Sequence, residues 1–359
     1  MKSSRTIDHS QQIVSKFNKN LNLMEFFRTR INELLSNYYS KEDVLHQSLN
    51  RALFYSRRRL RGTLAYCGSG LVGNIPESAD SIAMAYEIIT ANYVLMDDSV
   101  ILDAGTIRAN MPTPRVEYGE VAALLSACII QLEPILLLPD NKQLKDVFYK
   151  SARDTVIGWL LEHQLAELPA GTTVDENEIL QVSRLLTGPL LAGALTSGAI
   201  IGGGTPQIEA LSRYAMDFGC AYQLSDHIVD LMQTPDNSGK DNFSDIQTNK
   251  KNIVINHGLQ VLPIDSPERN RVIDAILTVP SASNKKEIQR IFQDSKSIEY
   301  CLKLITKLNS QAISHLEKLP ENKYRSLLEI IPQMYVSELL KSIGKGEGNS
   351  DLAPLSKKA

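Results

Sequence analysis

Hydrophobic residues recur along most of the chain every three to four positions, with polar residues between them. This spacing puts the apolar side chains on one face of a helix. Strand-like alternation is scarce, and the apolar pair at residues 254–255 is too short to count as a strand. The pattern predicts an all-α protein with helices at residues 13–35, 82–102, 121–137, 144–168, 179–201, 208–232, 269–277, 286–292, 298–319 and 323–343.

Breakers rich in proline and glycine separate these predicted helices. They are short, so none of them could link two separate domains. We therefore expect one large helical domain over residues 1–343. The tail from residue 344 to 359 is rich in glycine, serine and lysine, a composition typical of disorder.

The composition argues against several classes of protein. The 359 residues carry a net charge of −3, without the basic excess of a nucleic-acid-binding protein. Four cysteines lie far apart with no Cys-x-x-Cys pair, which argues against zinc and redox motifs and fits a cytoplasmic location. We expect no transmembrane segment, because no uncharged apolar stretch reaches the roughly 18 residues of a membrane span. The most apolar run, residues 188–204, is rich in glycine and alanine and predicts a tightly packed core helix.

A cluster of carboxylates follows the apolar helix predicted at residues 82–102. Asp97, Asp98 and Asp103 fall within seven residues. Such groups are costly to bury unless a cation lies beside them, and their oxygen atoms suit magnesium. The simpler interpretation is a helix end whose charges face water.

A second cluster lies near the end of the helix predicted at residues 208–232. Asp226 and Asp230 are four residues apart and share a helix face, to which Gln223 also belongs. Two carboxylates on one face repel each other unless a cation neutralises them. His227 lies between them, but a lone histidine is more often a packing or hydrogen-bonding partner, and magnesium prefers oxygen.

Basic residues accompany both clusters. Arg108 follows the first cluster, Lys240 and Lys250 follow the second, and residues 57–61 contain four arginines. Each could be a solvated surface charge. Together, carboxylates that hold magnesium and cations around them are typical of a diphosphate clamp.

With these motifs in their order, the chain resembles the trans-isoprenyl diphosphate synthase family. The family's Asp-Asp-x-x-x-x-Asp and the following Arg-Arg-Gly-x-Pro-Thr align without a gap with residues 97–103 and 108–113. Its Gln-x-x-Asp-Asp-x-x-Asp aligns with residues 223–230, and its later Gly-Lys and Asp-x-x-x-Gly-Lys with residues 239–240 and 245–250. Weaker similarities fall at residues 57–62 and 186–188.

The resemblance implies a bundle of helices around one deep central cavity, and a magnesium-dependent enzyme that ionises an allylic prenyl diphosphate. It implies roles for individual residues. Three magnesium ions with the diphosphate would be held by Asp97, Asp98, Asp103, Asp226 and Asp230. The allylic diphosphate would be gripped by Arg108, Thr187, Gln223, Lys240 and Lys250, and isopentenyl diphosphate by Arg58 and Arg61. Asp97, Asp103, Asp226 and Lys240 would be the catalytic residues.

Several positions depart from the family pattern, mostly on the side that would bind isopentenyl diphosphate. The second arginine of Arg-Arg-Gly is Ala109, and a histidine or glutamine position is Thr90. The lysine of Lys-Thr-Gly is Leu186, the first glycine of the Gly-Lys-Arg motif is Arg57, and the middle aspartate of the second motif is His227. Each lost contact to a diphosphate would cost about 1.5–3 kcal/mol.

Residues just before the first acidic motif form the cavity floor in this family. By analogy, Thr90, Asn92 and Tyr93 would line the cavity, and a tyrosine at position 93 favours a product no longer than farnesyl. The alternative is that Tyr93 is an ordinary core residue.

Four functions fit these observations. The eroded isopentenyl site favours a terpene synthase, which would cyclise its substrate or eliminate a proton with release of pyrophosphate. The alternative, favoured by Arg58, Arg61 and Lys250, is a short-chain prenyl diphosphate synthase of the geranyl or farnesyl type. A prenyltransferase to another acceptor and a non-catalytic partner subunit are further alternatives. Homodimers are common in the family, so a homodimer is expected.

Overall fold

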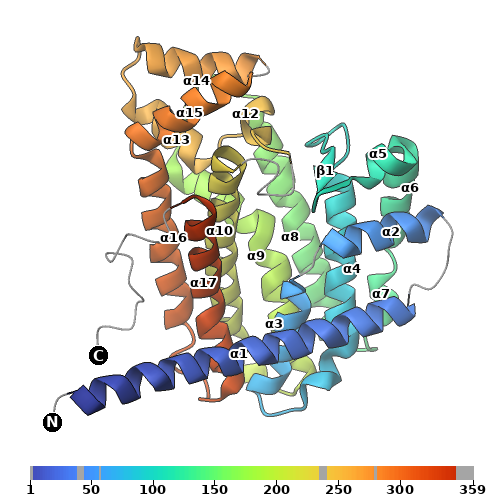
Figure 1. The fold of residues 1–359 in the computed structure, drawn as a ribbon. Coiled ribbons are helices and arrows are strands. Elements are labelled where there is room, and N and C mark those ends of the chain that lie inside the picture. The colour runs from blue at the N-terminus through green and yellow to red at the C-terminus, as the bar shows by residue number, and fades with distance from the viewer. Residues whose placement is uncertain (1–2, 39–43, 56–57, 234–240, 279–280, 345–359) are drawn as a thin grey trace.

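The computed structural model describes residues 3–38, 44–55, 58–233, 241–278 and 281–344. This part of the chain is almost entirely helical, which confirms the predicted all-α class (Figure 1). Its only strands are β1 (Ile107–Arg108) and β2 (Met111–Pro112), which form a small hairpin. The predicted disordered tail lies outside the described residues, apart from Gly344.

The first half of the chain forms a group of helices that ends in the central helix α9. Its elements are α1 (Ser3–Tyr38), α2 (Val44–Tyr55), α3 (Leu60–Leu71), η1 (Pro76–Ala79), α4 (Asp80–Asp97), α5 (Pro114–Tyr118), α6 (Glu120–Ile130), α7 (Pro134–Leu137), α8 (Lys142–Ala166) and α9 (Glu176–Ile201).

The second half packs against α9 and extends past it at one end. Its elements are η2 (Thr205–Gln207), α10 (Ile208–Met232), α12 (Ser244–Gln247), α13 (Ile253–Val261), α14 (Pro267–Leu277), α15 (Ala282–Asp294), α16 (Ser297–Ser314) and α17 (Lys323–Ser342). Helices α12 to α15 gather at the top of the view in Figure 1.

Most predicted helices are present, but three differences stand out. The pattern missed α2, α3, α5, α12 and α13, and the apolar pair at residues 254–255, which was too short to count as a strand, lies in α13. The predicted helix at residues 121–137 is split into α6 and α7 by a turn before Pro134. The helix predicted to reach residue 102 ends at Asp97, and the next residues form turns.

Close packing around α9 accounts for its unusual composition. A Cβ atom on Gly198 would lie 2.0 Å from the carbonyl oxygen of Ala65 in α3. A Cβ atom on Gly219 of α10 would lie 2.5 Å from the Cα atom of Gly188 in α9. Only glycine permits helices to approach so closely. The expectation of a tightly packed core helix at residues 188–204 is confirmed for the part that lies in α9.

Within the described ranges of the chain, two segments are long and apolar enough to cross a membrane by length and composition alone. In α9, 72% of the most apolar window is buried inside the bundle, as in the core helix of a globular protein. The other segment, Glu120–Leu137, covers α6 and α7 and has only 28% of its window buried. Its apolar outer face therefore requires a separate explanation.

Candidate active site

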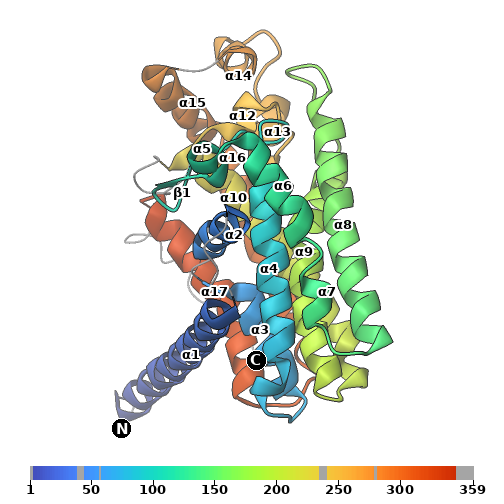
Figure 2. The same cartoon turned by 90° about the vertical axis from the view of Figure 1, so that its right-hand side faces the viewer.

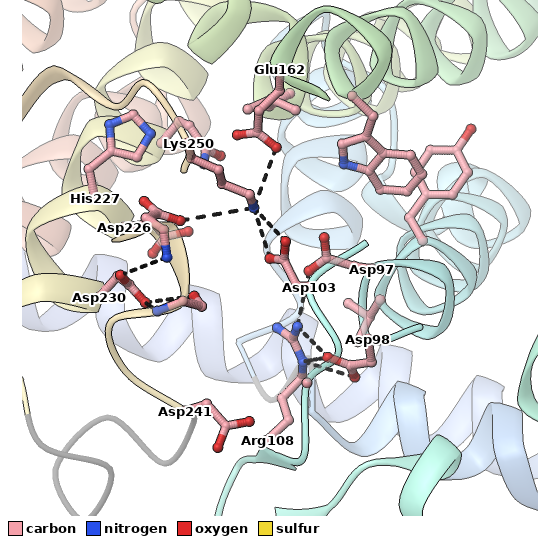
Figure 3. Close-up of a pocket in the computed structure, with 18 of the residues that line it drawn as sticks. Asp97, Asp98, Asp103, Arg108, Glu162, Asp226, His227, Asp230, Asp241 and Lys250 are labelled. Carbon is pink, nitrogen blue, oxygen red and sulfur yellow. Dashed lines mark hydrogen bonds and ion pairs between the residues drawn. The ribbon is translucent and has the colours of Figure 1, made fainter. Parts of the chain in front are cut away.

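The two acidic motifs open into one cavity near the C-terminal ends of α4 and α10. Helices α8 and α9 form two more of its walls, and the β1–β2 hairpin and the loop before α12 border it (Figure 3). The fold therefore brings together carboxylates that are more than 120 residues apart in the sequence. Its lining includes Asp97, Asp98, Asp103, Arg108, Asp226, Asp230, Asp241, Asp245 and Lys250.

The first acidic motif turns back on itself after α4. Asp97 is the last residue of the helix, and its carbonyl oxygen accepts a hydrogen bond of 3.0 Å from the backbone N–H of Asp103. This turn brings the Asp103 carboxylate to the same cavity as Asp97. A continuous helix to residue 102 would not contain this turn, so the early end of α4 has a clear consequence for the site.

Arg108 lies against the first motif. Its guanidinium donates hydrogen bonds to both oxygens of Asp98, the shortest at 2.7 Å, and contacts Asp97 at 3.1 Å. Asp98 is 1% exposed. Gly105 makes room for this arrangement, because a Cβ atom there would lie 2.4 Å from Oδ1 of Asp98. Asp98 therefore holds Arg108 at the edge of the cavity.

The second motif uses its two aspartates differently. Both line the cavity, but both oxygens of the buried Asp230 also accept hydrogen bonds from the start of α12. The donors are the N–H and hydroxyl groups of Ser244 and the N–H of Asp245. The metal role predicted for Asp230 stays a prediction, and the contacts present give it a structural role.

The neighbouring polar residues of α9 and α10 also meet at the cavity. The Thr187 hydroxyl donates a hydrogen bond of 2.7 Å to Gln223. Gln223 lines the cavity, and His227 lines it with 4% of its surface exposed. Lys240 belongs to residues 234–240, which lie outside the described residues.

Lys250 joins the two sides of the cavity. Its Nζ atom lies 2.7 Å from Asp103 and 3.4 Å from Glu162 of α8 (Figure 3). Burial alone would lower the pKa of Lys250, but these carboxylates and Asp245 raise it well above its ordinary value. Lys250 therefore stays charged and partly neutralises the acidic side chains around it.

Two carboxyl groups keep their protons unusually well in this cavity. Burial, reinforced by the charge of Asp103, raises the pKa of Asp97 to about 6. Burial also raises the pKa of Glu162 to about 7, although Lys250 opposes this shift. Because both shifts arise mainly from burial, a cation bound beside these groups would favour their charged forms.

The position of the acidic motifs suits a metal that a substrate helps to bind. Carboxylates at helix C-termini face the negative end of the helix dipole, which makes an external cation favourable. In the part of the chain that the structure describes, no three acidic, histidine or cysteine side chains already form a metal cluster. Magnesium typically binds one or two carboxylates and completes its shell with water and substrate phosphate oxygens. The all-oxygen donors Asp97, Asp103 and Asp226 fit that pattern.

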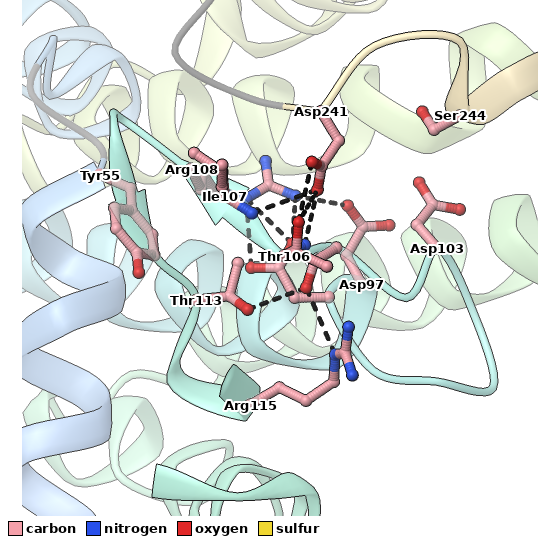
Figure 4. A network of polar contacts seen from close by, with 12 residues as sticks. Tyr55, Asp97, Asp103, Thr106, Ile107, Arg108, Thr113, Arg115, Asp241 and Ser244 are labelled. Atoms are coloured by element: carbon pink, nitrogen blue, oxygen red, sulfur yellow. Dashed lines mark hydrogen bonds and ion pairs between the residues drawn. The ribbon is translucent and has the colours of Figure 1, made fainter. Parts of the chain in front are cut away.

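Asp241 connects the loop before α12 to the hairpin that carries Arg108. Its carboxylate accepts hydrogen bonds from the backbone N–H groups of Thr106 and Ile107, at 2.6 and 3.1 Å, and from the Thr106 hydroxyl (Figure 4). The partners lie 134 and 135 residues away in the sequence. Asp241 therefore fixes the backbone immediately before Arg108.

We expect the Asp241→Ala variant to bind allylic diphosphate about ten- to a hundred-fold more weakly, because the hairpin and Arg108 would lose a charged anchor. Steady-state KM values and the melting temperature measure this effect. Thr106→Val should reproduce part of it, and Asp140→Ala, which removes an exposed carboxylate paired with Lys145, is the control. Equal affinity in Asp241→Ala and the wild type would contradict the anchoring role.

The arginines predicted to bind a second diphosphate differ in their surroundings. Arg61, in α3, lines the cavity, and its buried Nε–H group has no hydrogen-bond partner among the described residues. Arg58 is exposed, and its guanidinium forms an ion pair of 2.7 Å with Glu338 of α17. Arg59, between them, pairs with the fully buried Glu87 and serves the fold.

Two of the three residues predicted for the cavity floor line the cavity. Tyr93 lines the cavity, its ring packs 4.9 Å from that of Trp159 in α8, and its hydroxyl donates to the Ala152 carbonyl. Thr90 also lines the cavity. Asn92 is fully buried and is absent from the described lining, and its amide lies near the Met96 sulfur, so its predicted place in the cavity stays a prediction.

Among the cavity residues that sequence reasoning missed, Trp159, Glu162 and Asp241 are the most informative. Trp159 and Glu162 lie three residues apart on one face of α8, and Asp241 follows Lys240. The signal for the first two was a carboxylate and the chain's only tryptophan on an otherwise apolar helix face. No local signal reveals Asp241, because its partners lie on a distant hairpin.

Comparison with known proteins gives this geometry a family context. A family model described as polyprenyl synthetase matches residues 42–295. A short chain isoprenyl diphosphate synthase of Methanocaldococcus jannaschii is 29% identical over 284 residues, which cover 76% of this chain and 82% of the relative. A geranylgeranyl diphosphate synthase of Saccharolobus solfataricus is 27% identical, with 73% and 80% covered.

Solved structures share the fold. A polyprenyl synthase from Caulobacter crescentus, in complex with calcium and isoprenyl diphosphate, superposes with a TM-score of 0.80 at 19% identity, covering 89% of this chain and 97% of that one. A geranylgeranyl pyrophosphate synthetase from Pyrococcus horikoshii gives a TM-score of 0.76 at 23% identity, covering 89% and 99%. At these identities the likeness establishes the arrangement of helices.

Proposed function

Since the chain belongs to the polyprenyl synthetase family, and is an enzyme of the type that acts on allylic diphosphates, we propose that it elongates a prenyl chain. It joins an allylic diphosphate to isopentenyl diphosphate and releases pyrophosphate. The relatives described above are named as short-chain and geranylgeranyl diphosphate synthases, which supports this proposal.

The observation that carries the proposal is the unpartnered Nε–H group of Arg61. A buried donor without a partner is costly, so such a group indicates a ligand that is absent from the free protein. Arg61 lines the same cavity as both acidic motifs but lies on α3, away from the Arg108 hairpin. A second cation of this kind suits a second diphosphate, which chain elongation requires.

The expectation of a terpene synthase is wrong. Relatives that cover most of the chain are named as prenyl diphosphate synthases, among them a geranylfarnesyl diphosphate synthase of Natronomonas pharaonis. The sequence argument counted the missing contacts at Thr90 and Ala109. It could not count the environment of Arg61, where burial makes a charge-assisted contact stronger than at an exposed site.

The residues of the cavity suit the chemistry of ionisation. Asp97, Asp103 and Asp226 are the groups that would hold magnesium, and the chemistry that magnesium supplies when bound is neutralisation of charge on the leaving diphosphate. Arg108 and Lys250 already lie beside these carboxylates. They can turn to the phosphate oxygens and take up the charge that develops there.

The reaction breaks the C1–O bond of the allylic diphosphate and forms a bond from C1 to C4 of isopentenyl diphosphate. Loss of a proton from C2 completes a chain that is one isoprene unit longer. Arg61 would orient the acceptor. The apolar and aromatic side chains of Val94, Leu190, Tyr93 and Trp159 exclude water from the allylic cation, and the last two close the cavity after a short chain.

The test is incubation with magnesium, radiolabelled isopentenyl diphosphate and dimethylallyl, geranyl or farnesyl diphosphate. We expect longer prenyl diphosphates that form only when isopentenyl diphosphate is present. Arg61→Met should raise the KM for isopentenyl diphosphate about ten- to a hundred-fold and change the KM for the allylic substrate little. Arg213→Met, which removes an exposed arginine of α10, is the control. Failure to consume isopentenyl diphosphate with any of the three partners would refute the proposal.

We also propose that the enzyme is a homodimer that pairs through α6, α7 and α8. Eight large apolar side chains on these helices and on the turn between α6 and α7 are 44–78% exposed. A gathering of exposed apolar side chains of this kind marks an interaction site. These side chains are Val121, Leu125, Ile129, Leu132, Leu136, Tyr149, Val156 and Leu160. Figure 2 shows α6 and α7 on the side of the molecule turned to the viewer. A second copy of the same face would bury these side chains and explain the apolar segment Glu120–Leu137.

Cytoplasmic location and a single domain over residues 1–343 remain predictions of the sequence.

The Leu125→Glu variant should sediment as a monomer at about 10 µM, whereas the wild type should sediment as a dimer, because an unpaired charge in an apolar interface costs several kcal/mol. Sedimentation velocity measures the mass. Leu277→Glu places the same charge at an exposed leucine of α14 and should leave the dimer intact. A monomeric wild type, or a dimeric Leu125→Glu variant, would contradict this interface.

A further inference from the structure

Glu338 of α17 is paired with the guanidinium of Arg58. The two side chains form an ion pair of 2.7 Å and are each about half exposed, at 54% and 50%. Arg58 also lies over the ring of Tyr335, 4.8 Å from its centroid. Helix α17 thus supplies both a carboxylate and an aromatic face to an arginine that precedes α3.

This contact lies beside the cavity wall. Tyr335 packs against Tyr222 at 5.0 Å between ring centroids, and Tyr222 is adjacent to Gln223, which lines the cavity. Arg61, which also lines the cavity, follows Arg58 by three residues. Arg58 is not part of the cavity lining, but both arginines lie close to Tyr222 and Tyr335. Only Arg61 is without a carboxylate partner in the described structure.

The charges decide what Glu338 does to a second anion. An ion pair at this exposure contributes only about 0.2–1 kcal/mol, so a diphosphate with several charges can displace the carboxylate. The displaced carboxylate stays nearby and repels the diphosphate. Whether Glu338 leaves Arg58 or remains beside it, its negative charge weakens binding of a second diphosphate.

We propose that Glu338 is a specificity-determining residue that lowers the affinity of the acceptor site by competing with isopentenyl diphosphate for Arg58. The inference rests on the proposed elongation reaction and adds a residue of α17 to its acceptor site. Since the opposing charge lies on α17, the affinity for the allylic substrate at Arg108 and Lys250 is unaffected.

The experiment measures equilibrium binding of isopentenyl diphosphate in magnesium buffer by calorimetry, followed by the KM values of both substrates. Glu338→Gln should bind isopentenyl diphosphate about three-fold more tightly, and Glu338→Lys about ten-fold, with an unchanged KM for the allylic diphosphate. In an Arg58→Met background Glu338→Gln should improve binding less, because the competition for Arg58 is gone and only the repulsion by the carboxylate remains. A purely structural role of the ion pair predicts weaker rather than tighter binding by Glu338→Gln. Glu329→Gln is the control, because Glu329 lies on the same helix and pairs with Arg325 instead.

Unchanged or weaker binding of isopentenyl diphosphate by Glu338→Gln would overturn the inference, and weaker binding would mean that Glu338 positions Arg58. The proposed function has its own criterion, namely whether the wild type consumes isopentenyl diphosphate. If the wild type elongates chains but Glu338→Gln binds isopentenyl diphosphate no more tightly, only the proposed role of Glu338 is refuted. Absence of acceptor binding by both proteins would remove both proposals.

Discussion

The Asp97→Asn variant should turn over about a thousand-fold more slowly than the wild type, while its metal-free form resists urea better. The first effect follows from losing a carboxylate that would hold magnesium against the leaving diphosphate. Interactions of this kind contribute several kcal/mol to the transition state, and about 4 kcal/mol corresponds to three powers of ten in rate. The second effect follows from the burial of the Asp97 carboxylate, reinforced by the charge of Asp103.

The stability gain has a defined pH dependence. The pKa of Asp97 is about 6 in the folded protein, against an ordinary value of 3.8. A group whose pKa is raised by folding adds stability below its unfolded value, and that stability is lost as the pH rises through the folded value. At pH 8 the folded wild type contains a buried, ionised Asp97, which lowers its free energy of unfolding. Asp97→Asn lacks this charge, so its free energy of unfolding should be higher by about 1–3 kcal/mol. At pH 4 the two should unfold alike.

Metal separates the two effects. Magnesium together with inorganic pyrophosphate should stabilise the wild type, because ligands that bind only the folded state raise its stability, and should stabilise Asp97→Asn far less. Asp146→Asn, at an exposed aspartate paired with Lys142, controls for the loss of any one negative charge. An Asp97→Asn protein that keeps wild-type turnover, or that unfolds more easily at pH 8 in EDTA, would show that the cavity is not built to hold a cation.

The acidic motifs could be found from the sequence because each is local. Spacings of four and six residues decide which carboxylates meet on one helix end, and helical periodicity supplies the helices that carry them. The exact turn after Asp97 could not be read in the same way. Val100 and Ile101 extend the apolar pattern beyond α4, yet they are 59% and 73% exposed, so hydrophobicity alone predicted a helix that is too long.

Residues that act across the fold escaped prediction. Asp241 contacts a hairpin 135 residues away, and Glu338 contacts an arginine 280 positions earlier, so neither pairing leaves a periodic signal. The same limitation misled the functional interpretation. Ala109 was taken as evidence of a lost acceptor site, but it is one of two turn residues with positive φ that close the β1–β2 hairpin, and Arg61 still faces the cavity.

The Tyr93→Ala variant should make products at least one isoprene unit longer than those of the wild type. The Tyr93 ring is 8% exposed and, with Trp159, closes the cavity between α4 and α8. Its removal opens space in the direction in which the growing chain extends from the acidic motifs. Chromatography of the dephosphorylated products measures chain length. Trp159→Leu should shift the products in the same direction, because it removes the other half of the pair.

The Asn92→Ala variant distinguishes two causes of longer products. One is the loss of the Tyr93 ring that blocks the cavity, and the other is a general loosening of α4. Asn92 is the preceding residue and is fully buried, but it does not line the cavity in the described structure, so its truncation should cost stability and leave chain length unchanged. Cutting a large buried side chain such as Tyr93 costs about 3–5 kcal/mol, so both variants are compared well below their melting temperatures. Longer products from Tyr93→Ala alone would show that the tyrosine ring limits the length of the product chain. Equal lengthening in both variants would instead mean that the stiffness of α4 limits the chain.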